Sequence, residues 1–441
     1  MQMQQTDGKD DLIRRANALI AQAGHFRRIG EIERTLRTSH AALELYTLAG
    51  DQAGKVEALN ILSWAYQLQG RYADALAALE TILAIIRELG DRPAEAATLH
   101  NIANIYQSQG RWNEALRLYE ISLTTTQALG DRHAESQTLN NLGSVYQMQG
   151  RYAEALVALE TALAIFRELG DRHSEAATLH NIANIYQSQE QWNKALQLYE
   201  ISLATKRDLG DRLGEAQTLH NLGNVYQLQG RYADALPALE DALTIFHELG
   251  DQRGEAQTLN NLGLLYRKQG KFENALEALS QSQNIFATIG LVQQVKRVNA
   301  VYADVASELG KQFIEQGRWY DGLRLLEESL VIYRQNENLA RRADIIYQIA
   351  RTHHLMGNFD KARVHYRDAL RLYHHTDNQR GIAACKTSLG RLAVQMGFSS
   401  DAVQELEQAH QIYNEIGDAQ RANEVEEVLK LAGRVKERQL A

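Results

Sequence analysis

The sequence has little cysteine and proline, and it has no long apolar run. Its one cysteine, Cys385, excludes an intramolecular disulfide and is typical of a reducing compartment. Its two prolines, Pro93 and Pro237, argue against long Pro-rich linkers. Residues 1–15 lack the apolar core of a signal peptide, and no apolar stretch approaches the roughly 20 residues of a membrane span. We therefore expect a cytoplasmic protein with no membrane partner.

The chain also lacks an excess of positive charge. Its formal net charge is -8. Residues 1–290 hold 26 Lys and Arg against 35 Asp and Glu, whereas residues 291–441 hold 21 against 20. Nucleic-acid binding needs a strongly basic patch, so we expect no nucleic-acid partner.

Motifs for catalysis and cofactor binding are missing as well. There is no phosphate-binding loop, no G-x-G-x-x-G, no H-E-x-x-H and no cysteine pair. Cys385 has no activating motif and is interpreted as a small core residue. His353, His354 and His365 do not form a zinc set, because adjacent helix residues point apart and zinc needs a tetrahedral set of ligands. We expect neither enzyme activity nor a metal or cofactor.

What the chain has is a period of 40 residues. From residue 51 to residue 290, six blocks follow one template, D-R-x-x-E-A-x-T-L-x-N-L-G-N-x-Y-Q-x-Q-G-R-Y-x-x-A-L-x-x-L-E-x-A-L-x-I-F-R-E-L-G. A fixed period of this size indicates a repeat architecture in which each unit buries its apolar face against its neighbours.

Each block predicts a helical hairpin. In block 211–250, Asp211 is expected to cap a first helix, on which apolar residues recur at three- and four-residue spacing. Gly230 ends that helix. A second helix starts near Tyr232 and ends at Gly250, so the two helices have about 16 and about 18 residues.

These blocks resemble the tetratricopeptide repeat family. The hallmark positions recur at the same offsets in neighbouring blocks: Leu222, Gly223, Tyr226, Gly230, Tyr232, Ala235, Leu239 and Ala242. The resemblance covers residues 51–290 strongly and 303–420 more loosely. Common members repeat every 34 residues. The longer repeat here is similar to those of kinesin light chains, Pins-type adaptors and bacterial arrays attached to signalling ATPases or caspase-like domains, and no such catalytic domain is expected in this chain.

The resemblance implies an all-α fold, a right-handed α-solenoid superhelix of about ten hairpins with a C-terminal capping helix. We assign a degenerate first repeat to residues 11–50, six regular repeats to 51–290 and three divergent repeats to 303–420. Between them, residues 291–302 form a seam, where seven inserted residues lengthen a helix. Residues 421–438 are assigned to the capping helix, which solenoids need for solubility.

The blocks alternate in kind. Block 91–130 matches block 171–210 at 30 of 40 positions, but matches its neighbour 131–170 at only 19. Two explanations stay open: duplication of an 80-residue pair without functional consequence, or a binding surface with an 80-residue period. Block 171–210 also has Glu190 where the others have a turn glycine, so we expect a looser or differently shaped turn there.

The family resemblance places the first helices on the concave face of the superhelix. Residues three to five positions apart on these helices then share that face. The candidate peptide-binding residues are His100, Asn101, Asn104, Gln107, Asn140, Asn141, Ser144, Gln147, His180, Asn181, Asn184, Gln187, Gln217, His220, Asn221, Asn224 and Gln227.

Amides suit the recognition of an extended peptide, because Asn and Gln both donate and accept hydrogen bonds. The resemblance adds that Pins-type adaptors grip extended peptides with such an N-L-G-N element, and that the Lys-rich clamp of chaperone-tail binders is missing. The alternative is structural: these side chains bridge to neighbouring helices and fix the superhelical pitch. We favour that alternative for the inner column, which includes Asn101 and Asn141, and ligand contact for the outer column, which includes Asn104 and Asn224.

Beyond residue 290 the lining becomes basic. The corresponding residues are Lys311, Arg351 and Arg391, with Tyr347 and His354 nearby. A basic wall that faces an acidic partner segment is one hypothesis, and a solvated charged face is the other.

From these features we expect a protein–protein interaction scaffold or adaptor that holds an extended or helical peptide in a concave groove. The alternatives are a self-assembling structural module, which would be a homo-oligomer, and a sensor array for a separate effector protein. The sequence does not identify the partner.

Overall fold

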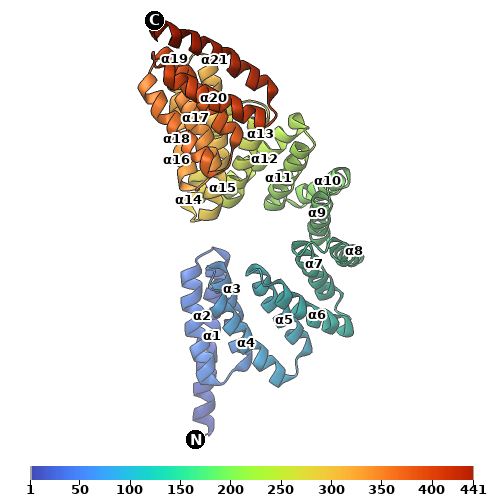
Figure 1. The fold of residues 1–441 in the computed structure, drawn as a ribbon. Coiled ribbons are helices and arrows are strands. Elements are labelled where there is room, and N and C mark those ends of the chain that lie inside the picture. Colours follow the sequence, from blue (N-terminus) through green and yellow to red (C-terminus); the bar gives the residue numbers. More distant parts are fainter. Residues whose placement is uncertain (1, 441) are drawn as a thin grey trace. The chain divides into compact units, whose positions relative to one another are not determined.

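The computed structural model describes residues 2–440, and it describes side chains for residues 8–433 (Figure 1). Residues 2–440 form helices joined by short turns, with no strand among them, so the chain is an all-α solenoid of helical hairpins. The helices are α1 (Gln2–Arg28), α2 (Ile32–Ala49), α3 (Gln52–Leu68), α4 (Tyr72–Leu89), α5 (Arg92–Ser108), α6 (Trp112–Leu129), α7 (Arg132–Met148), α8 (Tyr152–Leu169), α9 (Arg172–Ser188), α10 (Trp192–Leu209), α11 (Arg212–Leu228), α12 (Tyr232–Leu249), α13 (Gln252–Lys268), α14 (Phe272–Thr288), α15 (Val292–Glu315), α16 (Trp319–Gln335), α17 (Leu339–Leu355), α18 (Phe359–His375), α19 (Gln379–Gln395), α20 (Ser399–Glu415) and α21 (Ala419–Leu440).

The helices group into two compact units, residues 1–218 and residues 219–441, and the boundary falls within α11. Inside each unit, successive helices pack against one another along the chain. Odd-numbered helices also contact the next odd-numbered helix, as α5 contacts α7 and α17 contacts α19. The described residues show no comparable contact between even-numbered helices. The odd-numbered helices therefore form the inner face of each unit, and the even-numbered helices form its outer face.

The ends of the helices follow from local sequence. The Asp131 carboxylate, just before α7, accepts a hydrogen bond from the Ala134 amide at 3.0 Å and so satisfies a donor in the first turn. At the end of α8, Gly170 adopts a left-handed backbone conformation with φ of 69°, and the next amide, that of Asp171, donates to the Phe166 carbonyl at 2.9 Å. The aspartate and glycine of the template thus start and stop the helices.

The expectation of a looser turn at Glu190 was wrong. Glu190 adopts the same left-handed conformation as the glycines, with φ of 59°. Its amide donates to the Gln187 carbonyl at 3.0 Å, and the Gln191 amide donates to Tyr186 at 2.8 Å. Gly150 makes the equivalent bond at 2.9 Å. Packing of the two flanking helices imposes the turn, and the glutamate tolerates the backbone strain.

The alternation of blocks has a packing basis. A β-carbon added at Gly143 would lie 2.5 Å from the side chain of Leu159, and one added at Gly223 would lie 2.6 Å from Leu239. Such overpacking typically costs ~1–3 kcal/mol. In the other kind of block the glycine is an alanine, such as Ala103, and the facing residue is Tyr119. The 80-residue period therefore alternates between a glycine–leucine pair and an alanine–tyrosine pair.

The seam between the regular and divergent repeats is visible as a long helix. α15 has 24 residues, against 17 for α13.

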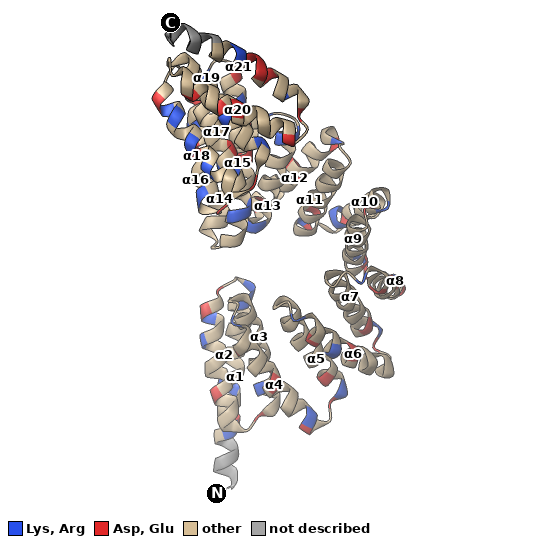
Figure 2. Ribbon diagram, viewed as in Figure 1, with Lys and Arg blue, Asp and Glu red and all other residues tan. Residues whose placement is uncertain are grey.

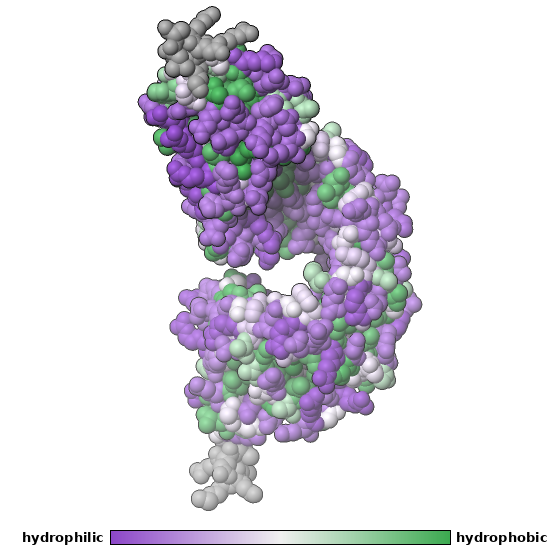
Figure 3. Space-filling view, in the orientation of Figure 1, coloured by the Kyte–Doolittle hydropathy of each residue, from purple (hydrophilic) through white to green (hydrophobic). Residues whose placement is uncertain are grey.

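Lys and Arg residues lie along α16 and α18 (Figure 2). Hydrophilic residues cover most of the C-terminal unit on the face seen in Figure 3. None of the helices in residues 2–440 has the length and hydropathy of a membrane span.

Candidate functional site

The candidate residues all lie on odd-numbered helices and thus on the inner face. His100, Asn101, Asn104 and Gln107 are on α5, with equivalents at Asn140, Asn141, Ser144 and Gln147 on α7 and at His180, Asn181, Asn184 and Gln187 on α9. Gln217, His220, Asn221, Asn224 and Gln227 are on α11, and Lys311, Arg351 and Arg391 are on α15, α17 and α19.

Part of this set surrounds a hollow of about 390 Å³ between α5, α7 and α9, which we call the amide hollow. The polar residues that line it are His100, Gln137, Asn140, Asn141, His173, Ser174 and Thr178. Thr178 donates to the Asn140 amide oxygen at 3.2 Å, and Asn181 donates to the same oxygen at 3.2 Å. The amide hollow is therefore walled by neutral side chains held in a hydrogen-bonded network.

His100 is part of that network rather than free in the hollow. Its Nδ1 lies 3.0 Å from the Thr138 hydroxyl, and its Nε2 lies 3.1 Å from the Asn141 amide nitrogen. Burial lowers the pKa of His100 to about 4, so the ring is neutral at pH 7. In the C-terminal unit, His220 bonds Thr258 and Asn261 in the same way, at 2.9 and 3.2 Å, and burial also lowers its pKa to about 4.

Some side chains of the outer column also form hydrogen bonds with neighbouring residues. The Tyr119 hydroxyl donates to the Asn104 oxygen at 2.5 Å and to the Gln107 oxygen at 2.7 Å, and Asn141 donates to Asn104 at 3.0 Å. Tyr199 makes the same pair of bonds to Asn184 and Gln187. Where the facing residue is a leucine, as Leu239 faces α11, no such hydroxyl is present.

The remaining amides differ in exposure. Asn101 and Gln217 are exposed, whereas Gln147, Asn221, Asn224 and Gln227 are half-buried. The Ser144 hydroxyl donates to the Asn140 backbone carbonyl of its own helix at 3.2 Å. Among these positions, Asn101, Gln137 and Gln217 present the most side-chain surface to solvent.

A second hollow, of about 810 Å³, lies between α17, α18 and α19, and we call it the arginine hollow. It is lined by Tyr347, Arg351, His354, Leu355, Gly357, Phe359, Tyr366, Ser388, Arg391 and Gln395. The sequence thus correctly grouped Arg351 and Arg391 with Tyr347 and His354. Ser388 and Gln395 were not anticipated.

The polar groups around the arginine hollow bond to one another. Tyr347 and Ser388 share a hydrogen bond at 3.2 Å, and His354 Nε2 lies 2.8 Å from the Gln395 oxygen. Burial raises the pKa of Tyr347, which therefore stays protonated. Arg351 and Arg391 are exposed and have no ion-pair partner among residues 8–433. Two positive charges therefore face this hollow without a compensating carboxylate.

The basic wall does not extend evenly along the inner face. Lys311 lies on α15 and does not line the arginine hollow. Arg267, which precedes it, pairs with Glu308 at 2.5 Å and with Asp304 at 3.6 Å. The charge of Arg267 is therefore neutralised, whereas Arg351 and Arg391 have no ion-pair partner among residues 8–433.

Two structural roles were not predicted from the sequence. The threonine of E-A-x-T-L, such as Thr138 or Thr178, bonds the histidine or asparagine of the preceding repeat. Tyr119 and Tyr199 hold the outer asparagines. Both residues repeat along the chain, the threonine every 40 residues and the tyrosine every 80, so the periodicity itself was the available signal.

Known protein families with similar sequences also indicate helical repeats. Family models described as tetratricopeptide repeat match residues 94–168, 135–208, 174–248, 214–288, 302–375, 342–415 and 56–91. No curated protein matches the chain.

Several solved structures are similar to this chain, and those with a TM-score above 0.5 share its fold. A signal transduction ATPase with numerous domains (STAND) from Pyrococcus horikoshii, with a tetratricopeptide repeat sensor, is 15% identical with a TM-score of 0.59, over 83% of this chain and 53% of that chain. A Rap protein complexed with competence and sporulation factor is 15% identical with a TM-score of 0.51, over 82% and 98%. The repeats of a kinesin light chain from Podosopora anserina are 26% identical with a TM-score of 0.38, over 44% and 96%.

Proposed function

Because the chain belongs to the tetratricopeptide repeat family, we propose that it is an interaction scaffold that binds peptide segments of partner proteins on its inner-face helices. The family and its structural neighbours support a protein-interaction or regulatory repeat scaffold. The finer proposal is that the arginine hollow binds an acidic segment and the amide hollow binds extended main chain.

The arginine hollow carries this proposal. Arg351 and Arg391 face it without ion-pair partners among residues 8–433. An incoming carboxylate would form charge-assisted hydrogen bonds with either guanidinium, and these bonds are roughly twice as strong as neutral ones. The hydroxyls and amides beside them, such as Ser388 and Gln395, supply partners for a peptide backbone.

The amide hollow complements it with a different chemistry. Its walls carry both donors and acceptors, which match the two polar groups of each peptide unit in an extended chain. Gln137, which lines this hollow, is exposed. Because no charge faces the hollow from these side chains, it would read main chain with little demand on sequence.

The test uses the full chain and three fluorescein-labelled peptides of equal length: one rich in Glu, one neutral and one rich in Lys. Fluorescence anisotropy gives the affinity of each. We expect the acidic peptide to bind most tightly, and to bind about tenfold more weakly to the double variant Arg351→Ala, Arg391→Ala, because charge-assisted bonds are lost.

A matched control removes the same charge elsewhere. Arg324→Ala with Arg334→Ala takes two exposed arginines from α16, outside the arginine hollow, and should leave the affinity unchanged. Equal weakening by both double variants would reduce the effect to general electrostatics. No binding of the acidic peptide to the unaltered chain would overturn the proposal for this hollow.

A second candidate function is a sensor array that regulates a separate effector. It is favoured by the fold shared with the STAND protein, whose repeats are described as a sensor. Multi-angle light scattering separates it from self-assembly, since a sensor or adaptor keeps a small, fixed mass as concentration rises. Mass that grows with concentration would instead identify a self-assembling module.

A further inference from the structure

On most odd-numbered helices, the residue four positions before the turn glycine carries an aromatic ring, and we call this position the ring register. The rings are Phe26, Tyr66, Tyr106, Tyr146, Tyr186, Tyr226, Tyr266 and Phe313. In α17 the same register holds His353, which stacks on His365 with ring centroids 5.6 Å apart. In α19 it holds Ala393, which has no ring at all.

In several of these repeats a cation stacks on the ring, and at Tyr146 and Tyr266 a carboxylate lies near the hydroxyl. The Arg151 guanidinium stacks over Tyr146 at 4.3 Å, and Arg71 stacks over Tyr66 at the same distance. Burial and the neighbouring Glu240 carboxylate, which bonds the hydroxyl, raise the pKa of Tyr266. The hydroxyl end of the ring thus faces a glutamate on the preceding even-numbered helix.

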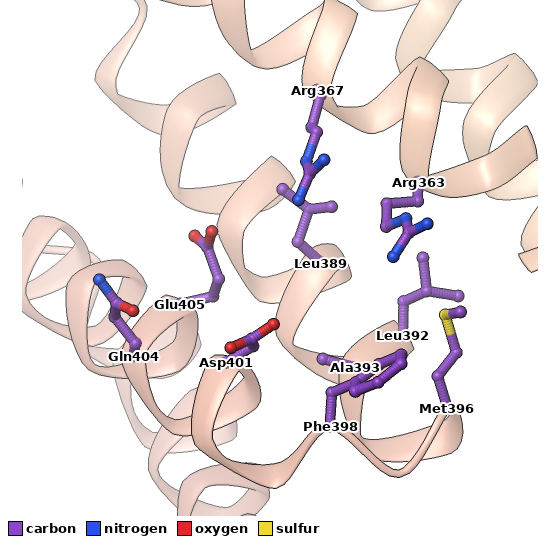
Figure 4. A pocket seen from close by; sticks show the side chains of 10 residues that line it. All are labelled: Arg363, Arg367, Leu389, Leu392, Ala393, Met396, Phe398, Asp401, Gln404 and Glu405. Atoms are coloured by element: carbon purple, nitrogen blue, oxygen red, sulfur yellow. The ribbon is translucent and has the colours of Figure 1, made fainter. Parts of the chain in front are cut away.

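At Ala393 the place of the ring is open. A hollow of about 270 Å³ lies between α18, α19 and α20, on the outer face of the C-terminal unit (Figure 4). Its apolar lining comprises Leu389, Leu392, Ala393, Met396 and Phe398. Phe398 replaces the stacking arginine of the regular repeats, and its side chain is 49% exposed. The equivalent groove between α6 and α8 also holds a hollow, of about 420 Å³, and there Tyr146 forms one wall. What distinguishes the hollow at Ala393 is therefore its lining rather than its volume.

On the α18 side of this hollow, positively charged residues replace the glutamate of the regular repeats. Arg367 occupies the register that holds Glu120 and Glu240 elsewhere, and Arg363 lies one turn before it. Both side chains extend toward the apolar floor in Figure 4. Arg367 has no ion-pair partner among residues 8–433, whereas Arg363 pairs with Asp360 at 3.2 Å.

The opposite rim is acidic. Asp401 and Glu405 on α20 face the hollow across from the two arginines (Figure 4). Lys386 pairs with Glu405 at 3.1 Å and compensates that carboxylate. A ligand that enters with its negative end toward α18 therefore meets complementary charge.

We propose that this hollow is a second binding site, on the face opposite the inner one, for an aromatic side chain in an acidic segment of a partner protein. Eight repeats place their own Tyr or Phe ring at this register, which indicates that the groove beside it accommodates an aromatic ring. The ring would pack on Leu389 and Leu392, and an acidic group beside it would pair with Arg367.

The first test asks whether a ring enters the hollow. The probe is a blocked pentapeptide with one tyrosine among four glutamates, compared with the same peptide carrying alanine in place of tyrosine. The protein is the full chain with Arg351→Ala and Arg391→Ala, so that the arginine hollow does not compete. Saturation-transfer NMR should show the tyrosine ring in contact, and the alanine peptide should bind at least about tenfold more weakly.

Two further variants locate the contact. Ala393→Tyr fills the hollow with the chain's own ring, so the ring signal of the peptide should disappear while the melting temperature stays equal or rises. Arg367→Glu restores the residue of the regular repeats and should weaken binding about tenfold. Arg371→Glu, an exposed change one turn further along α18 and outside the hollow, should leave it intact.

Each result bears on the proposal. A ring signal that survives Ala393→Tyr, or an affinity that Arg367→Glu and Arg371→Glu lower equally, would overturn it. So would a tyrosine peptide that binds no better than its alanine version. Because the arginine hollow is disabled in all these chains, failure here is separate from failure of the inner-face proposal.

Discussion

At the scale of single residues, the buried histidines link the hydrogen-bonded networks to pH. His100 and His220 each lie between a threonine hydroxyl and an asparagine amide of the next repeat. Burial lowers their pKa to about 4, from 6.5 in the unfolded chain. Each ring therefore stays neutral in the folded protein over a pH range in which the unfolded chain takes up a proton.

The sign of the resulting pH dependence follows by linkage. Between pH 6.5 and about 4 the unfolded state binds more protons, so the free energy of unfolding falls as the pH falls through this window. Each histidine contributes up to about 1.4 kcal/mol per pH unit. Above pH 6.5 the contribution is constant.

The chain itself suggests the variant that tests this. Asn140 and Asn260 occupy the same register as the two histidines, and Asn140 accepts a hydrogen bond from the next threonine. We expect His100→Asn with His220→Asn to make unfolding less sensitive to acid between pH 6.5 and 4. Urea denaturation at pH 5 and pH 7.5 measures the effect.

Carboxylates whose pKa is lowered, such as Glu215, destabilise the protein in the same direction on acidification. The difference between the unaltered chain and the double variant isolates the histidines, since both chains carry the same carboxylates. If the two chains lose the same free energy of unfolding between pH 7.5 and pH 5, the two histidine rings are solvated in the folded protein and titrate as they do in the unfolded chain.

At the scale of the element, the turn at Glu190 stores strain that the turns with glycine avoid, and Glu337 and Asp377 share this left-handed conformation. Glycine adopts a left-handed conformation without a steric penalty, whereas other residues pay roughly 1 kcal/mol. Glu190→Gly should therefore raise the free energy of unfolding by about 1 kcal/mol, measured by chemical denaturation. The reverse change at an equivalent turn, Gly150→Glu, should lower it by a similar amount. Destabilisation by Glu190→Gly would show that the glutamate side chain makes a contact worth more than the strain.

The helices and turns could be predicted because they depend on local signals. An aspartate at the start of the regular hairpins, a glycine at most turns and apolar residues at helical spacing were enough to define the hairpins. Residues 2–440 follow that pattern even where Glu190 replaces the glycine, because neighbouring helices impose the turn.

The site was harder to predict, because partners come from other repeats. The sequence placed Asn104 on the inner face, but its oxygen is taken by Tyr119, 15 residues on, and by Asn141 in the next repeat. Likewise, the hollow at Ala393 is lined by residues of α18, α19 and α20, and it becomes evident only when these helices are in place. Periodicity predicts which residues share a face of the helix. The packing of neighbouring repeats then determines which of these side chains remain free to bind a ligand.

At the scale of the whole molecule, each helix packs mainly on its neighbours in sequence. Stability in such an array is approximately a sum of repeat and interface contributions. The 80-residue alternation adds a condition, because the residues that meet the preceding block differ between the two kinds of block, as Ile102 and Leu142 do. A shortened chain should be most stable if its new junction keeps the native residues.

Deletion of residues 91–170 keeps that order. It joins α4 to the segment 171–188, which differs from the native neighbour 91–108 only at positions 93 and 94. The new junction therefore repeats the native contacts almost unchanged. We expect a shorter solenoid with the same helicity per residue by far-UV circular dichroism and with cooperative thermal unfolding.

Deletion of residues 91–130 is the matched control. It places Leu142 and Val145 where α4 normally packs on Ile102 and Ile105, so the residues at the junction with α4 change. Although this chain is longer, it should melt at a lower temperature than the 80-residue deletion, because its altered junction packs less well. If the 40-residue deletion proves the more stable, the alternation carries no packing information, and the 80-residue period must be explained by duplication or by the binding surface. Loss of helical signal in the 80-residue deletion would instead contradict the additive description of the array.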